Sequence, residues 1–233
     1  MADKKTEKSG IDADVFARRT LLGRKVGMTQ VFDDEDSVSP VTLIEAGPCT
    51  VVQVKSSKGK DGYDAVQIGF REKSKNIKKP QLGHFKKASV PAYEKLREVR
   101  LKKPDHGLAP GVELTVEIFE GIEKVDIQGI SKGRGFAGTI KRWHFSRGPE
   151  SHGSMNVRQP GAIGCSADPS RVFKGTHMAG HMGNKTRTCR NLRLVKIDRE
   201  RNLLYVRGSV PGPNGGYVQI TASRVKAKKT QNS

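Results

Sequence analysis

The sequence predicts a mainly β protein that carries one long irregular insertion. Short apolar segments, rich in Val, Ile and Leu, recur along most of the chain and are separated by clusters of turn residues. Residues 131–189 interrupt this pattern, because their apolar positions follow neither a two-residue nor a 3.6-residue period. Many short strands at short spacing are typical of a β-barrel or a β-sandwich.

The individual elements follow from the same pattern. We predict strands at residues 21–32, 41–46, 49–54, 65–70, 112–116, 124–127, 192–197, 203–206 and 217–220. Turn residues separate them, including Asp33-Asp34-Glu35-Asp36 and Gly47-Pro48. The pair 192–197 and 203–206, joined by a short polar turn, is the clearest hairpin. Residues 71–95 form a smaller basic insertion, and a short helix is predicted near residues 92–99.

The domain organisation combines the two halves of the chain, since the strands on either side of the insertion are too few to close a barrel alone. We predict a mobile tail at 1–19, one β-domain from 20–128 and 191–224, an extension at 129–190, and a basic tail at 225–233.

The charge balance points to a polyanionic partner. The chain has 43 lysines and arginines against 24 acidic residues, a formal net charge of +19. Phosphate backbones neutralise such a surplus and release counterions. Binding to an anionic membrane surface would require a basic amphipathic helix, and the basic segment contains none. No apolar run approaches the length of about 20 residues that is needed to span a bilayer. The N-terminus lacks an apolar secretion signal, and the three cysteines have no CxxC spacing. A cytosolic protein without membrane contact is expected.

Residues 131–189 hold the main candidate site. Ten glycines interrupt the segment, and only Glu150 and Asp168 oppose its positive charge. Such a segment suits an arm that takes its shape from RNA. The predicted RNA-binding residues are Lys132, Arg134, Lys141, Arg142, Trp143, His144, Arg147, Arg158, Arg171, Lys174, Lys185 and Arg187.

The aromatic residues Phe136, Trp143 and Phe145 alternate with these basic residues. Aromatic faces stack on unpaired bases, so RNA contact is our preferred interpretation. Packing inside the arm is the alternative.

Other chemistry finds weaker support. Gly133–Gly138 matches GxGxxG but has no acidic residue at the offset that binds ribose. Cys165, His177, His181 and Cys189 are zinc-ligand types without a close pair, so we predict no metal. Ser151 and His152 are adjacent but lack a nucleophile elbow. We expect that the protein is not an enzyme and that it has no cofactor and no small-molecule substrate. A zinc- or nucleotide-dependent enzyme and an RNA chaperone acting outside the ribosome are the alternatives.

Several motifs resemble one family. Phe119, Asp126, Gly129, Ser131 and the glycine-rich run GRGFAG, followed by Arg142, form the pattern FxxxxxxDxxGxSxGRGxxGxxxR. That pattern is similar to the signature of the large-subunit ribosomal protein three family. The similarity extends to LLGRKVGMTQVFDD, LGHFKKA, PGAIG, RVFKGTHMAGHMGN and RNLLYVRGSVPGPNGG, and it is strongest with the bacterial form.

This resemblance implies a translation-protein-type six-stranded β-barrel and a long extension through 23S rRNA towards the peptidyl transferase centre. It also implies early subunit assembly, neighbouring large-subunit proteins as partners, and a cytoplasmic location in the ribosome. The inner end of the extension would lie at Ile163, Gly164, Cys165, Ser166, Ala167 and Asp168. Some bacterial members carry a methylated glutamine just after the segment PGAIG; here Cys165, Ser166, Ala167 and Asp168 follow, and none of them is a glutamine.

Overall fold

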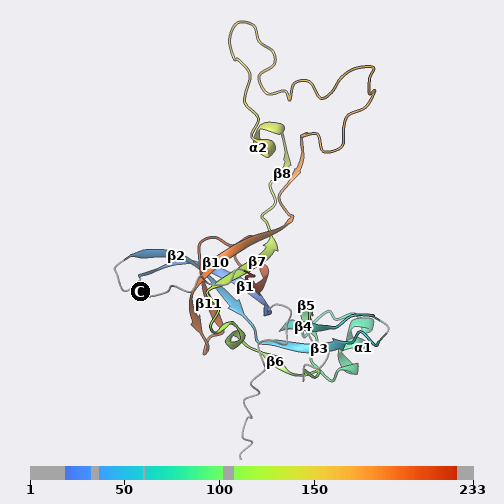
Figure 1. Cartoon of the computed structure of the whole chain (residues 1–233), viewed down its shortest axis with the longest axis vertical. Helices are drawn as coiled ribbons and strands as arrows, with labels where there is room; N and C mark the ends of the chain where they lie inside the picture. The colour runs from blue at the N-terminus through green and yellow to red at the C-terminus, as the bar shows by residue number, and fades with distance from the viewer. Residues whose placement is uncertain (1–18, 33–36, 60, 102–107, 225–233) are drawn as a thin grey trace, which may run out of the picture. The chain divides into compact units, whose positions relative to one another are not determined.

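The structure is a computed structural model of the chain, and it describes residues 19–32, 37–59, 61–101 and 108–224 (Figure 1). The chain divides into two compact units, one formed by Ser131–Thr186 and the other by the residues before and after that segment. The predicted tails, apart from Arg19, and the predicted turn at 33–36 lie outside the described residues. No helix in the described part of the chain is long and apolar enough to cross a membrane.

The prediction of a mainly β protein is confirmed, and six strands of the first unit close into a barrel. Around the barrel their order is β1 (Thr20–Phe32), β12 (Tyr217–Ala222), β7 (Lys124–Ile130), β10 (Thr186–Asp198), β11 (Leu203–Arg207) and β2 (Val38–Ala46). The predicted hairpin is confirmed, because Asp198 of β10 pairs with Leu203 of β11. Closure removes the exposed edges that an open sheet would have.

Alternate residues of these strands build the barrel core. Leu21 of β1 lies opposite Ile220 of β12, and Ile220 lies opposite Ile127 of β7. Ile44 of β2 lies opposite Leu204 of β11, and all five side chains are fully buried. Side chains of one face meet across neighbouring strands, so these positions form one continuous apolar layer.

A second sheet of four strands belongs to the same unit. Its order is β5 (Tyr93–Arg100), β4 (Ala65–Glu72), β3 (Cys49–Lys55) and β6 (Glu113–Leu114). Val51, Val66 and Ile68 of this sheet join the same hydrophobic cluster as the barrel side chains. The sequence analysis placed these strands in the barrel domain. The alternation of apolar residues cannot distinguish a barrel strand from a strand of a second sheet that packs into the same core.

The predicted helix at 92–99 is wrong, because residues 93–100 form strand β5. Tyr93 pairs with Glu72, and its ring covers Gly69, where an added Cβ would lie 2.5 Å from the ring. Tertiary pairing therefore overrides the local preference of a charged segment. The helix of this region is α1 (Lys79–Lys87), which begins with a proline in its first turn and buries only Phe85.

The predicted strand at 112–116 is shorter than expected. Only Glu113–Leu114 pairs with β3, and a 3-10 helix, η1 (Val116–Phe119), follows. Its Phe119 is one of the largest fully buried side chains.

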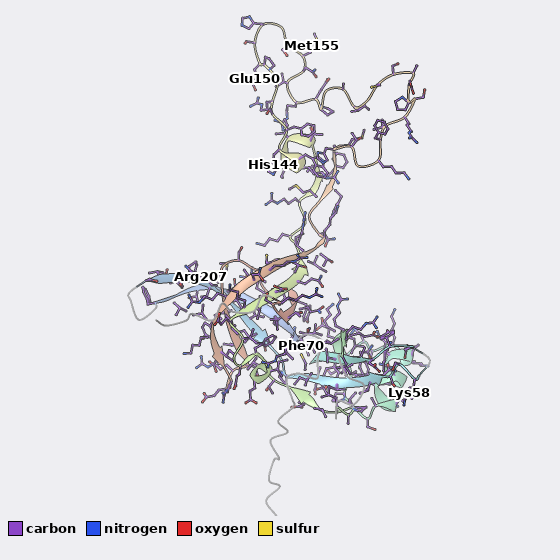
Figure 2. All side chains as sticks on the ribbon, viewed as in Figure 1. Lys58, Phe70, His144, Glu150, Met155 and Arg207 are labelled. Carbon is purple, nitrogen blue, oxygen red and sulfur yellow. The ribbon has the colours of Figure 1, made fainter. Side chains whose placement is uncertain are left out.

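The second unit has little regular structure and almost no core. It contains β8 (Gly135–Ala137), α2 (Thr139–Trp143) and β9 (Gly180–Met182), with β8 and β9 paired antiparallel. Only Ala137 and Thr139 are buried in Ser131–Thr186. His144, Glu150 and Met155, labelled in Figure 2, are all exposed on its long loop.

Candidate nucleic-acid interface

The base of the second unit is fastened by backbone hydrogen bonds between its two ends. Ser131 N donates to Lys185 O at 2.9 Å, and Asn184 N donates to Ser131 O at 3.2 Å. The hydroxyl of Ser131 also donates to Lys185 O at 3.1 Å. Arg134 N donates to Met182 O at 2.9 Å, next to the β8–β9 pair. These hydrogen bonds join residues far apart in sequence and define a neck, residues 131–137 and 180–185.

Gly183 is required by this neck. Its φ of +76° is in the left-handed region, and an added Cβ would overlap Lys132 O. The same Cβ would lie 3.0 Å from Arg134 N. A glycine at this position therefore lets the two limbs of the neck approach each other.

Beyond the neck, a second set of contacts joins the two limbs of the unit. We call it the clasp, and it is formed by Arg142, Trp143, His177 and Met178. The guanidinium of Arg142 donates to Met178 O at 2.7 Å, and the indole Nε1 of Trp143 donates to the same oxygen at 2.8 Å. The Trp143 and His177 rings stack with centroids 4.0 Å apart and planes inclined by 11°. Two donors and one stack thus hold the ends of the loop formed by residues 144–176 together.

Helix α2 positions the two donors of this clasp. It is only five residues long and ends at Trp143, and the next residue, His144, reverses the chain with a φ of +62°. His144 N donates to Ile140 O at 3.0 Å, which closes the last turn. The side chains of Arg142 and Trp143 consequently reach the same carbonyl.

The loop 144–176 is held by local contacts rather than by a core. Arg147 forms an ion pair with Glu150 three residues on. Gly148 N donates to Val157 O at 3.0 Å, and Thr176 Oγ1 donates to Phe173 O at 2.8 Å. Phe145, Ile163 and His177 line an open hollow of about 310 Å³. None of these side chains is buried.

The predicted RNA-binding residues lie along this surface, and their contact with RNA stays a prediction. Arg142 is half-buried in the clasp, and the other predicted RNA-binding residues are exposed. Nine lysines and arginines of Ser131–Thr186 face two carboxylates, Glu150 and Asp168. Within the described chain, Arg147 is the only one of the predicted cations that forms an ion pair with a carboxylate. Arg187 lies on β10, in the first unit.

The aromatic residues Trp143 and Phe136 differ in which interpretation they fit, packing inside the arm or stacking on RNA bases. Trp143 uses one face for His177 and its N–H for Met178, so packing inside the arm accounts for most of its contacts. Phe136 is 80% exposed and keeps its ring available for stacking. The sequence pattern could not separate these two positions, because Trp143 meets His177 only through the fold.

The structure places the four zinc-ligand types, Cys165, His177, His181 and Cys189, in no metal-type cluster of the described residues. Among the described residues, no group of three or more His, Cys, Asp or Glu side chains could hold a metal ion. His177 stacks on Trp143, and burial raises the pKa of the Cys49 thiol to about 12. Cys165 is exposed and Cys189 is half-buried.

A polar groove on the outer face of the barrel was not identified from the sequence. Gln128, Thr188, Arg190, Gln219 and Arg224 are among the residues that line a groove of about 460 Å³. Gln128 Nε2 donates to Thr188 Oγ1 at 3.3 Å, which links β7 to β10. Arg190 adds a cation to the face that these strands share. In the sequence, this groove is marked only by one basic residue on a polar strand, and that pattern is too common to identify a binding site.

A family comparison accounts for this arrangement. The family model described as Ribosomal protein L3 matches residues 109–202, which include β7, the whole of the second unit and β10. The match over residues 109–202 supports the ribosomal protein L3 family. The resemblance inferred from the motifs is thereby confirmed.

This match supports an rRNA-binding protein of the large ribosomal subunit, with a role in translation. The family is structural rather than enzymatic. The matched range contains the neck, the clasp and the exposed cations described above.

Proposed function

We propose that Ser131–Thr186 is the part of this ribosomal protein that enters 23S rRNA, while the barrel holds the protein at the subunit surface. The observation that carries this proposal is the combination of exposed positive charge with a nearly absent core. Two buried residues, Ala137 and Thr139, cannot offset the conformational entropy of ordering the segment. Phosphate contacts supply both the missing stabilisation and the partner for its cations.

The proposed contacts follow from exposure. Lys132, Arg134, Arg158, Arg171 and Lys174 present uncompensated cations to phosphates. Lys141, His144, Arg147, Lys185 and Arg187 add to the same charged surface, and Trp143 and Arg142 shape it through the clasp. Arginine is favoured wherever a planar guanidinium grips a phosphate or stacks on a base.

The finer elements of the function rest on family resemblance. The barrel would be of the translation-protein type, and the protein would bind early and support subunit assembly in the cytoplasm next to neighbouring large-subunit proteins. Catalysis of its own is not part of the proposal. The tip of the loop, Ile163–Asp168 in the sequence, would approach the peptidyl transferase centre, and all six tip residues are exposed.

Salt titration of 23S rRNA binding tests the proposed contacts. Arg134→Gln, Arg158→Gln and Arg171→Gln should each reduce the slope of log K against log salt by about 0.7–0.9 for every phosphate that the variant no longer neutralises. Arg199→Gln is the matched control, because Arg199 pairs with Glu120 at 2.6 Å in the first unit. Slopes that match the parent protein in all three arm variants would contradict the proposal.

The position of the tip can be tested through Cys165. Cys49 is buried and Cys189 is half-buried, so a Cys189→Ser background directs a thiol-linked RNA-cleaving probe to Cys165. In assembled large subunits, cleavage should fall within the peptidyl transferase region of 23S rRNA. Cleavage restricted to the solvent-side helices would overturn the proposed path of the loop.

A further inference from the structure

The polar groove on the barrel lies across three neighbouring strands, β10, β7 and β12, of which Figure 1 labels the first two. All of its lining residues belong to the first unit. Ile127 of β7 and Ile220 of β12 are fully buried inside the barrel, so the residues next to them in sequence point outward. Gln128 and Gln219 therefore lie on the outer face, directly opposite each other. The groove volume of about 460 Å³ is within the range of small-ligand sites.

Hydrogen bonds among the lining residues hold the groove in a defined shape. Asn191 N donates to Asp126 Oδ1 at 2.9 Å, and Ser223 Oγ donates to Asn191 Oδ1 at 2.5 Å. Gln128 Nε2 donates to Thr188 Oγ1 at 3.3 Å. The polar side chains are thus oriented on paired strands, unlike those of the long loop in the second unit. A site on strands positions its groups more precisely than a site on a loop.

Two amides in this groove keep hydrogen-bonding capacity for a ligand. The side chain of Gln219 makes no hydrogen bond to any other residue that the structure describes. Gln128 Nε2 uses one of its two hydrogens on Thr188, and its carbonyl oxygen accepts no hydrogen bond from the described part of the chain. Each amide therefore offers one donor and one acceptor next to each other.

Adenine is the base whose edges match two such amides. Glutamine binds adenine through two hydrogen bonds, because its oxygen accepts from N6 and its amide nitrogen donates to N7. The N6 amino group has a second hydrogen, with the acceptor N1 on that side, so a second amide can bind the Watson–Crick edge. No amino group of cytosine or guanine has an acceptor on both sides, and uracil has no amino group. The second edge is open only when the adenine is unpaired.

Arg190 and Arg224 supply positive charge for a phosphate. Both line the groove, and both are exposed. Neither forms an ion pair with a carboxylate of the described residues. The groove contains one carboxylate, Asp126, whose Oδ1 accepts a hydrogen bond from Asn191 N. Planar guanidinium groups suit phosphate oxygens, so the groove combines groups for a base with groups for its phosphate.

We propose that this groove binds an unpaired adenosine nucleotide, with Gln128 and Gln219 on the two edges of the base and Arg190 and Arg224 on the phosphate. A nucleotide within an RNA strand and a free nucleotide present the same chemistry. The groove would give the barrel selectivity for a base, which phosphate contacts of the second unit do not provide. An RNA strand as the source of the nucleotide rests on the function proposed above, whereas the groove itself does not.

Binding of two short RNAs to the full-length protein tests the proposal. One is a uridine hexanucleotide, and the other has adenosine at a single internal position. We expect the second RNA to bind at least about fivefold more tightly, as one bidentate base contact provides. The double substitution Gln128→Met with Gln219→Met should abolish this preference and leave affinity for the uridine RNA unchanged. Phe136→Ala is the control, because an exposed ring of the second unit stacks on any base and the preference should survive its loss.

Three results would overturn the proposal. They are equal affinity of the parent protein for the two RNAs, a preference that persists in the double variant, and a preference that disappears in Phe136→Ala. Gln219→Met alone removes no hydrogen bond within the described chain, so it should reduce the preference without disturbing the fold. These results are independent of the proposed function, which the salt dependence of the Arg134, Arg158 and Arg171 variants tests separately.

Competition with AMP identifies the source of the nucleotide. Displacement of the adenosine-containing RNA alone would assign the groove to a free nucleotide. A preference that AMP does not disturb would assign it to a nucleotide held in an RNA strand. Equal displacement of both RNAs would contradict the site, because AMP would then act through its charge only.

The phosphate contact has its own test. Arg190→Gln should lower the slope of log K against log salt for the adenosine-containing RNA by about 0.7, the value for one phosphate contact on a single strand. An unchanged slope would contradict the role assigned to Arg190.

Discussion

The barrel unit and Ser131–Thr186 are stabilised by different kinds of interaction. The barrel unit collects its large apolar side chains, among them Phe119, Ile127 and Ile220, into a core that excludes water. The second unit relies on a few hydrogen bonds, one aromatic stack and a run of uncompensated cations. The first arrangement is complete within the protein, whereas the second becomes complete only when a polyanion is added.

The largest expected effect of this difference appears on removing one phenylalanine from each unit. Phe119→Ala should lower the free energy of unfolding by about 3–5 kcal/mol, because it leaves a cavity in a closed core. Phe136→Ala should change it by less than about 0.5 kcal/mol, since that ring is 80% exposed. Denaturant unfolding followed by circular dichroism measures both. Similar losses from the two substitutions would break the comparison.

A smaller effect is expected at the clasp. His177→Ala removes the ring stacked on Trp143 and should cost about 0.5–1.5 kcal/mol of local stability. Trp143 is the single tryptophan of the chain, so its fluorescence reports this site alone. Quenching by acrylamide should become more efficient in the variant. His181→Ala, on β9 opposite Phe136, is the control and should leave quenching unchanged. Equal quenching in all three proteins would show that the stack is absent in solution.

The smallest effect concerns an ion pair on the second sheet. Lys55 Nζ lies 2.8 Å from Glu98, and its hydrogen bond holds the pKa of the Glu98 carboxyl below the ordinary value of 4.5. A carboxyl with a lowered pKa stabilises the fold above its ordinary pKa and loses that contribution as pH falls through the folded-state value. The Glu98 side chain is 36% exposed, so solvent screening limits the contribution at pH 7 to less than about 1 kcal/mol.

The difference in stability between the parent and Glu98→Gln should therefore be present at pH 7 and vanish near pH 3. Thermal unfolding across this range measures it. Glu200→Gln, in the exposed turn between β10 and β11, is the control. A difference that grows as the solution becomes more acidic would contradict the assigned sign.

The sequence predicts the two regions unequally, for physical reasons. Alternating apolar residues located the six barrel strands and β3, β4 and β6, because burial of one face imposes a two-residue period, but they missed β5, β8 and β9. They did not show that β3, β4, β5 and β6 form a separate sheet, since both sheets contribute to one core. The strand at Tyr93–Arg100 was mistaken for a helix because its pairing with β4 depends on residues distant in sequence.

Composition identified the basic segment, since charge and glycine content need no fold to be recognised. It could not reveal that Trp143 stacks on His177, or that Arg142 and Trp143 share one carbonyl. Those contacts join positions about 35 residues apart through local geometry. The motif resemblance anticipated the family that the match over residues 109–202 supports.

Amide hydrogen exchange of the free protein and of the protein in assembled large subunits tests the central claim most directly. Amides of the barrel strands, such as those of Ile127 and Leu204, should be protected in both states. Amides of residues 144–176 should exchange rapidly in the free protein and become protected in the subunit, because rRNA supplies their order. Protection of the loop in the free protein equal to that of the barrel, or rapid exchange of the loop in the subunit, would contradict the account.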